Sequence, residues 1–226
     1  MKEKYDTVVS KSTLRRTFKE MGFTWRRVKK SLRSKRNQEL FDQAKVKIDE
    51  FIKAHYEGDL KLFYFDQVGF SLNPTVPYAW QEKGKSIELP SQKGGHINGI
   101  GMITPDNEFK SLIFDGNSDS ELMIYCFEYF FKYKRKNQKH VVIIDNAPIH
   151  RSDEFQAKIE EWKERNIEFY FLPPYSPELN IIEIVWRFVK NSWLDFESYV
   201  SKKSLIDGVA DVFKNIGSKY RITFER

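Results

Sequence analysis

The chain has 226 residues, of which 40% are hydrophobic, 15% aromatic and 31% charged, and its formal net charge is +6. This composition excludes a disordered tail and suffices for one ordinary domain with its own core plus an extension. A single cysteine, Cys126, excludes a disulfide framework, and no apolar run approaches the roughly 18 residues of a membrane span or the core of a signal peptide, so we expect a soluble, cytoplasmic protein.

The positive charge is concentrated near the N-terminus. From Lys11 to Arg36, eleven Lys or Arg residues stand against one acid, so this segment carries +10 and the remainder of the chain −4. A basic arm on a near-neutral body indicates a polyanionic partner, although a solvated charge run has the same composition.

The first predicted element is a helix over Ser10–Met21. Its apolar residues recur at helical spacing, Ser10 or Ser12 can cap its start, and Gly22 can end it. A short basic helix of this kind is typical of the recognition helix of a helix-turn-helix unit. Few residues precede it, so the unit looks cut off at its N-terminus. The cations that we assign to DNA contact are Arg15, Arg16, Lys19, Arg26 and Arg27.

A second helix is predicted over Asn37–Tyr56, closed by Gly58. It would link the basic arm to the body, and the sequence leaves open whether it packs there. The chain is therefore predicted to have three parts: a basic helix-turn-helix remnant over 1–36, a linker helix over 37–58 and a catalytic body over 59–226.

The body is predicted to open with strands. Leu62–Phe65 is an aromatic and apolar run, typical of a strand buried on both faces, and it ends at Asp66. After a loop that contains prolines, two further strands are predicted over His96–Thr104 and Phe109–Phe114. A helix with a capping box that begins at Ser118 comes next.

Strands and helices then alternate. A buried-strand run over Val141–Ile144 delivers Asp145 at its end, and a helical stretch leads to a strand over Ile167–Leu172. A Pro-Pro-Tyr-Ser-Pro segment turns the chain into a helix that carries Glu183 near its start. No Gly-rich loop follows either acidic strand end, which argues against a P-loop or Rossmann nucleotide fold.

Each of the three acids has an ordinary structural alternative. A strand-end aspartate such as Asp66 or Asp145 is commonly a turn former or a helix cap. Glu183 shares a helix face with Arg187 and Lys190, so a surface ion pair would explain it as well. Their order along the chain and their flanking residues favour a shared metal site.

Together these stretches resemble DDE transposases of the mariner-like superfamily, in its bacterial insertion-sequence branch. The residues that carry the resemblance are Tyr64–Phe65–Asp66, Ile144–Asp145–Asn146–Ala147–Pro148–Ile149–His150, and Leu172–Pro173–Pro174–Tyr175–Ser176–Pro177–Glu178–Leu179–Asn180, running into Glu183 and Trp186. The resemblance implies an α/β, ribonuclease-H-like fold, a mixed sheet flanked by helices, behind the basic helical extension. It also implies that Asp66, Asp145 and Glu183 are the catalytic metal ligands.

The sequence departs from this family at two points. The position after Asn180 is usually proline, which would preset the first helical turn, and here it is Ile181. Asn180 can still cap the helix, so we expect the site to be intact. The family normally has two helix-turn-helix units, and the front of that region is missing here.

The chemistry implied is an in-line displacement at phosphorus. Two Mg²⁺ or Mn²⁺ ions would activate the attacking hydroxyl and stabilise the leaving 3′ oxygen, and carboxylates supply the hard oxygen ligands that these ions prefer. Asp66 would bridge both ions. Arg187 and Lys190 are candidates for phosphate contacts, or for a solvated face, and Asn146 and His150 are candidates for supporting roles.

The function expected is therefore that of a transposase acting on double-stranded DNA. The resemblance suggests a TA target and a dimer that holds two DNA ends. The alternatives are a silent or truncated transposase-derived DNA-binding protein and a ribonuclease-H-like nuclease. The four tryptophans considered for base stacking are expected in the core instead: Trp80, Trp162, Trp186 and Trp193.

Overall fold

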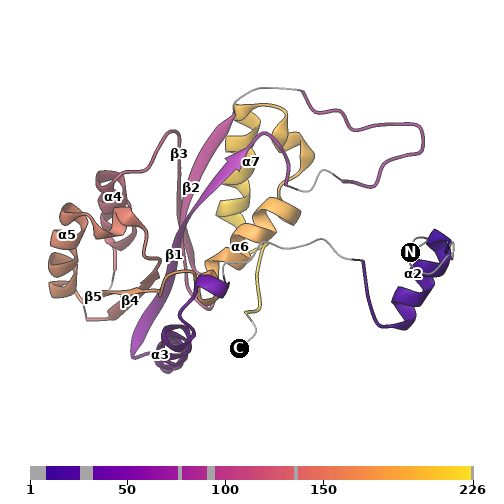
Figure 1. Ribbon diagram of the computed structural model, residues 1–226. Helices are drawn as coiled ribbons and strands as arrows, with labels where there is room; N and C mark the ends of the chain where they lie inside the picture. Colours follow the sequence, from indigo (N-terminus) through magenta and orange to yellow (C-terminus); the bar gives the residue numbers. More distant parts are fainter. Residues whose placement is uncertain (1–8, 26–32, 76–77, 91–94, 135–136, 225–226) are drawn as a thin grey trace. The chain divides into compact units, whose positions relative to one another are not determined.

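The computed structural model of the protein describes residues 9–25, 33–75, 78–90, 95–134 and 137–224 (Figure 1). The chain forms two compact units, residues 1–34 and 35–226. No helix within the described ranges is long and apolar enough to span a membrane.

The described part of the first unit contains helix α2 (Lys11–Glu20). Ser10 caps α2 as predicted, because its hydroxyl accepts a hydrogen bond from the backbone N–H of Thr13 at 3.1 Å. None of its residues is buried, so its cations are open to a partner. The DNA-contact candidates on α2 are Arg15, Arg16 and Lys19, whereas Arg26 and Arg27 lie outside the described residues.

The second unit is built on a five-stranded mixed sheet in the order β3-β2-β1-β4-β5. Its strands are β1 (Leu60–Ser71), β2 (His96–Ile103), β3 (Phe109–Phe114), β4 (Lys139–Ile144) and β5 (Ile167–Phe171). The antiparallel pairs are β1–β2 and β2–β3, and the parallel pairs are β1–β4 and β4–β5. The strand order and mixed directions agree with the fold class predicted from the sequence.

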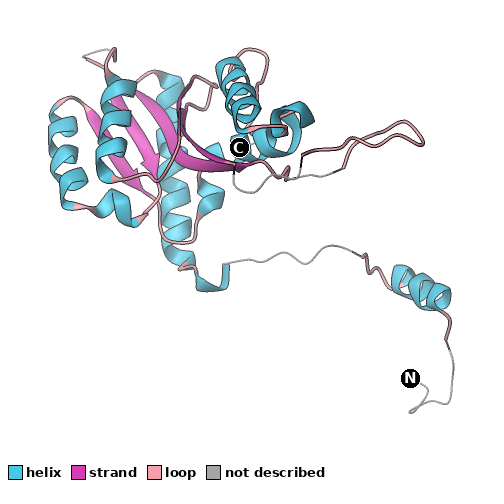
Figure 2. Cartoon of the chain, turned by 90° about the horizontal axis from the view of Figure 1, so that it is seen from above, coloured by secondary structure: helices cyan, strands magenta, loops and turns pink. Residues whose placement is uncertain are grey.

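Helices cover both faces of this sheet (Figures 1 and 2). Their bounds are α3 (Gln38–Glu57), α4 (Ser120–Phe131), α5 (Asp153–Glu164), α6 (Ile182–Phe188) and α7 (Lys202–Asn215). The short elements are the 3-10 turns η1 (Arg33–Lys35), η2 (Pro148–Arg151), η3 (Pro177–Leu179) and η5 (Phe196–Tyr199), and the π-helical turn η4 (Val189–Trp193).

Two hydrophobic clusters, one on each face, explain the unbroken apolar run of β1. Phe63 and Phe65 pack with α4 and α5, whereas Leu62 and Tyr64 pack with α3, α6 and α7. Successive side chains of a strand point to opposite faces, so a strand covered on both sides is apolar at every position. Helix α3 therefore does pack on the body, through Ala44 and Ile48, a point that the sequence left open.

Strand β1 is longer than predicted, and its second half extends beyond the end of its pairing with β4. The expected strand ended at Asp66, but β1 runs to Ser71 because its antiparallel pairing with β2 continues that far. Its parallel pairing with β4 stops at Tyr64, opposite Ile143. Beyond that point β1 and the chain after β4 separate, and Asp66 lies in the part of β1 that β4 leaves unpaired.

The other local predictions hold with small corrections. The cap of α4 is Asp119 and not Ser118, because the Asp119 carboxylate accepts the backbone N–H of Leu122 at 2.8 Å. Cys126 is a core residue as expected: it is fully buried, and burial raises the pKa of its thiol to about 12. The expectation of a core position was wrong for Trp80, which is fully exposed in the loop between β1 and β2.

Candidate functional site

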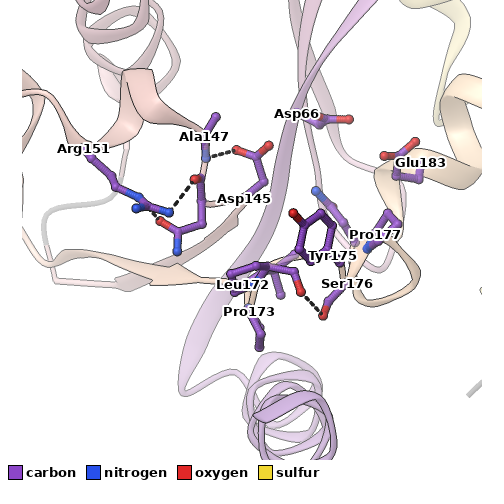
Figure 3. A pocket seen from close by; sticks show the side chains of 13 residues that line it. Asp66, Asp145, Ala147, Arg151, Leu172, Pro173, Tyr175, Ser176, Pro177 and Glu183 are labelled. Atoms are coloured by element: carbon purple, nitrogen blue, oxygen red, sulfur yellow. Dashed lines mark hydrogen bonds between the residues drawn. The ribbon is translucent and has the colours of Figure 1, made fainter. Parts of the chain in front are cut away.

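The three predicted acids come together in one pocket at the carboxyl ends of the parallel strands. Asp66 is supplied by β1, Asp145 follows the last residue of β4, and Glu183 lies in the first turn of α6. They line a cavity of about 300 Å³ and face a common space, with the Tyr175 ring beside it (Figure 3). The other lining residues are Asn146, Ala147, Arg151, Leu172, Pro173, Pro174, Ser176, Pro177 and Asn180.

Asp66 is the least solvated of the three acids. The indole N–H of Trp186 donates a hydrogen bond to its Oδ2 at 3.1 Å. Burial, reinforced by the negative charges of Glu183 and Asp145, raises the pKa of Asp66 from 3.8 to about 7. The pocket therefore holds more negative charge than its described side chains neutralise.

Asp145 is held by donors on its own side of the pocket. His150 Nδ1 lies 2.9 Å from its Oδ1, and the backbone N–H of Ala147 donates to the same oxygen at 3.2 Å. Burial alone would raise the pKa of Asp145, but the hydrogen bond and charge of His150 and the Ala147 N–H outweigh it, so the pKa is lowered. His150 is itself buried and is placed to orient this carboxylate.

Glu183 is exposed, and its surroundings do not fit the surface ion-pair alternative. Burial by neighbouring atoms and the charge of Asp145 raise the pKa of Glu183, while the charge of Lys190 lowers it. Among the described residues, no ion pair within 4 Å joins Glu183 to Arg187 or Lys190. The Lys190 ammonium lies 5.7 Å from the ring centroid of Phe70, and Arg187 is exposed.

Lys190 lies in the π-helical turn η4, which directly follows α6. A single widened turn inside a helix is frequent at functional sites, because it redirects the side chains that follow. In the sequence, Arg187 and Lys190 follow Glu183 at helical spacing, which predicted that the three side chains share one helix face. Of these two cations, Lys190 is the one whose charge lowers the pKa of Glu183.

Two lining residues take roles that differ from the sequence-based expectation. Asn180 does not cap α6, whose first flanking residue is Ile181 without a side-chain cap. Instead, Asn180 is buried and its Nδ2 donates to the backbone oxygen of Phe65 at 3.0 Å. Asn146 accepts a hydrogen bond from Arg151 Nε at 2.6 Å. Arg151 also lines the pocket, and it was not predicted from the sequence because it lies just beyond the matching motif.

Tyr175 is the strained residue of the site. Its φ is +59°, in the left-handed region that non-glycine residues enter at a cost, and its side chain is 45% exposed at the pocket. Strained backbone tends to occur at functional sites, where the surrounding structure enforces it. The pattern Pro-Pro-Tyr-Ser-Pro predicts a turn but not which of its residues is left-handed.

The strain at Tyr175 can be measured by comparing two substitutions that both remove the ring. We expect Tyr175→Gly to be more stable than Tyr175→Ala by about 1 kcal/mol, because only glycine adopts this conformation without a Cβ penalty. Urea unfolding of the two variants measures the difference. Equal stabilities, or a more stable alanine variant, would show that the left-handed turn is not strained.

The donor set of the pocket suits hard divalent cations. Three carboxylates face the space, and the raised pKa of Asp66 marks charge that a cation would relieve. Among the described residues, no group of three or more His, Cys, Asp or Glu side chains is close enough to hold one metal ion. The three carboxylates that line the pocket are nonetheless hard oxygen donors, of the kind that Mg²⁺ and Mn²⁺ prefer.

Comparison with known proteins places most of the chain in one family. Residues 61–206 match the family described as DDE superfamily endonuclease. The chain is 28% identical over 187 residues to the insertion element IS630 uncharacterized 39 kDa protein of Shigella sonnei, covering 77% of this chain. It spans 50% of the length of that relative.

Solved structures share the fold. The Mos1 mariner paired end complex with Mn superposes with a TM-score of 0.59 at 15% identity, covering 91% of this chain and 64% of that chain. A simian T-cell lymphotropic virus intasome, in complex with PP2A regulatory subunit B56 gamma, gives a TM-score of 0.51 at 14% identity, covering 74% of this chain and 52% of that chain. At these identities the likeness concerns the fold alone, and it confirms the ribonuclease-H-like architecture predicted from the sequence.

Proposed function

The chain belongs to the DDE superfamily endonucleases, and from this membership we propose that it is a transposase, or the catalytic part of one. It would cut DNA at the ends of its element and transfer the freed 3′ ends into target DNA. The observation that carries the proposal is the convergence of Asp66, Asp145 and Glu183 in one pocket from three separate elements. Because the chain spans half the length of its insertion-element relative, the activity of the whole protein is part of the proposal.

Asp66, Asp145 and Glu183 would hold two Mg²⁺ or Mn²⁺ ions, which would supply activation of the attacking hydroxyl and stabilisation of the leaving oxygen. The chain's own groups orient these ligands. His150 Nδ1, 2.9 Å from Asp145 Oδ1, would orient the Asp145 carboxylate, as outer hydrogen-bond partners do for metal-site carboxylates. No side chain is needed as a covalent nucleophile, since water or a DNA 3′ hydroxyl attacks phosphorus directly.

The cations around the pocket are suited to the DNA backbone. Arg151 lines the pocket beside Asp145, and Lys190 acts on Glu183 from the other side. Arg187 is exposed one helical turn beyond Glu183 on α6. These three residues would contact phosphates that flank the bond being cut, and such contacts position a duplex without reading its sequence.

The substrate would be double-stranded DNA in two forms, the element's terminal repeats and the target. The Mos1 mariner structure of similar fold is a paired end complex with Mn. We infer that this chain also works on paired DNA ends with a divalent metal, and that it does so as a dimer. A TA target and action in the prokaryotic cytoplasm belong to the same proposal. The basic first unit would contribute to holding the element end through α2.

The proposal is tested by nicking and strand transfer on a supercoiled plasmid that carries the element ends, with Mg²⁺, Mn²⁺ or EDTA. Nicking and joining that need the metal would support it. Intact DNA binding without cleavage would support a silent DNA-binding protein instead. Preferential cleavage of an RNA–DNA hybrid would support a ribonuclease-H-like nuclease.

The salt dependence of DNA binding tests the role of α2. We expect Arg15→Ala to flatten the slope of log affinity against log salt by about 0.9, because one phosphate contact and its released counterion are lost. Arg16→Ala should act in the same direction, and Lys163→Ala, an exposed lysine of α5, serves as the control. If neither arginine variant changes the slope, α2 is not a DNA-binding helix.

A further inference from the structure

The segment that carries Glu183 is hydrogen-bonded to two successive residues of β1, Phe65 and Asp66. Asn180 Nδ2 donates to the backbone oxygen of Phe65 at 3.0 Å, and Trp186 Nε1 donates to Asp66 Oδ2 at 3.1 Å. Asn180 lies just before α6, and Trp186 lies three residues after Glu183 on the helix. Glu183 is therefore flanked by two anchors that both reach the strand carrying the first acid.

The indole of Trp186 is buried among neighbouring side chains. It is 3% exposed and contacts the rings of Phe109 and Phe213, with centroid distances of 6.1 and 5.7 Å. The space for it is created by Gly101, which is paired directly with Asp66 across β1 and β2. A Cβ at Gly101 would lie 2.4 Å from the indole Cη2, so only glycine leaves room for the ring beside the Asp66 carboxylate.

The kind of donor matters for what Asp66 can do. An arginine or lysine in this place would neutralise the carboxylate and compete with a cation for it. An indole N–H is a neutral donor with one fixed direction, so it occupies part of one carboxylate oxygen and leaves the negative charge in place. The Trp186 N–H thereby orients Asp66 without adding a positive charge that would compete with a metal ion.

We propose that Trp186 and Asn180 are positioning residues that set the Asp66–Glu183 arrangement and thereby determine how tightly the pocket binds divalent metal. The proposal rests on the transposase function, since it concerns the same pocket. Both residues are buried and hydrogen-bonded to β1. Their effect passes through Asp66 and through the seating of α6 against β1, in the way that outer hydrogen-bond partners tune metal ligands.

The test is Trp186→Phe, which keeps an aromatic ring and removes the N–H. We expect Mn²⁺ binding to the DNA-free protein, measured by calorimetry, to weaken about 10- to 100-fold, the usual cost of losing such a partner. Cleavage should need correspondingly more Mn²⁺ for half-maximal rate, while the rate at saturating Mn²⁺ largely recovers. A role in packing alone would lower the folded fraction and leave the metal affinity of the folded protein unchanged.

Trp162→Phe is a matched control from the opposite face of the sheet. Trp162 is fully buried, and its indole N–H also donates to a carboxylate, Glu128 Oε1, at 2.9 Å. The same substitution there removes the same kind of hydrogen bond at a residue that does not line the pocket. It should lower stability and leave Mn²⁺ affinity unchanged.

The outcomes separate the two proposals. If the wild-type chain neither binds Mn²⁺ nor cuts DNA, the transposase function fails. If the wild type does both and Trp186→Phe binds Mn²⁺ as tightly as the wild type, only the positioning role is overturned. Should Trp186→Phe fail to fold, Asn180→Ala decides the matter by the same calorimetry, with weaker Mn²⁺ binding expected and an unchanged affinity overturning the proposal.

Discussion

Asp145→Ala is expected to lower metal-dependent DNA cleavage by about 10³-fold or more while leaving the fold intact. Losing one ligand removes several kcal/mol of transition-state stabilisation, and each ~1.4 kcal/mol is a factor of ten in rate. The fold should survive because the Asp145 side chain is 51% exposed. His150 also keeps a partner in the backbone oxygen of residue 145, at 3.2 Å.

The measurement is the single-turnover nicking rate of a supercoiled plasmid at saturating Mg²⁺, with circular dichroism to verify folding. Glu160→Gln is the control, since it removes an exposed acid of α5 outside the pocket. Cleavage by Asp145→Ala at the wild-type rate would refute the site assignment. Loss of cleavage in the control as well would point to a general effect of charge.

The second large effect concerns stability, and its direction depends on pH. Asp66 has an ordinary pKa of 3.8 and a folded-state pKa of about 7. Between these values the folded protein keeps a proton that the unfolded chain has released, so stability falls as pH rises through this window and stays low above it. At about 1.4 kcal/mol per pKa unit, the penalty is at most about 4 kcal/mol.

Asp66→Asn should therefore stabilise the metal-free protein at pH 8 and change it little near pH 4. Asparagine keeps an oxygen that can accept the Trp186 N–H, so the main change is loss of the buried charge. Thermal unfolding at both pH values measures the effect, with Glu160→Gln again as control. Added Mn²⁺ should raise the midpoint of the wild type at pH 8 more than that of the variant. An Asp66→Asn variant that is destabilised at pH 8 would contradict the expectation.

Local patterns predicted most of the strands and helices within one or two residues. Phe109–Phe114 and the helix that begins after Asn37 were recognised from alternation, periodicity and caps, which are properties of neighbouring residues. The length of β1 was not recognised in this way, because its second half is held by β2, a partner about thirty residues along the chain. Pairing between distant segments leaves no mark in the local pattern.

The candidate site likewise combines features that local patterns predict with features that depend on distant residues. The three acids could be named from their motifs, and the structure brings them together in one pocket. The bonds that orient them could not, because Asn180 meets Phe65 and Trp186 meets Asp66 across 115 and 120 residues of sequence. Asn180 was assigned a local capping role because side-chain to backbone bonds are usually local. Here a neighbouring strand offered a buried carbonyl instead.

The long sequence separation between Trp186 and Asp66 also means that the pocket can be completed only late in synthesis. The two are 120 residues apart, and the indole is enclosed by Phe213, which comes later still. A nascent chain that ends with β5 contains Asp66 and Asp145 but lacks the helix that carries Glu183. Because the pocket joins residues from β1, from the end of β4 and from α6, it can be completed only after α6 has been made, so its assembly is a late step of folding.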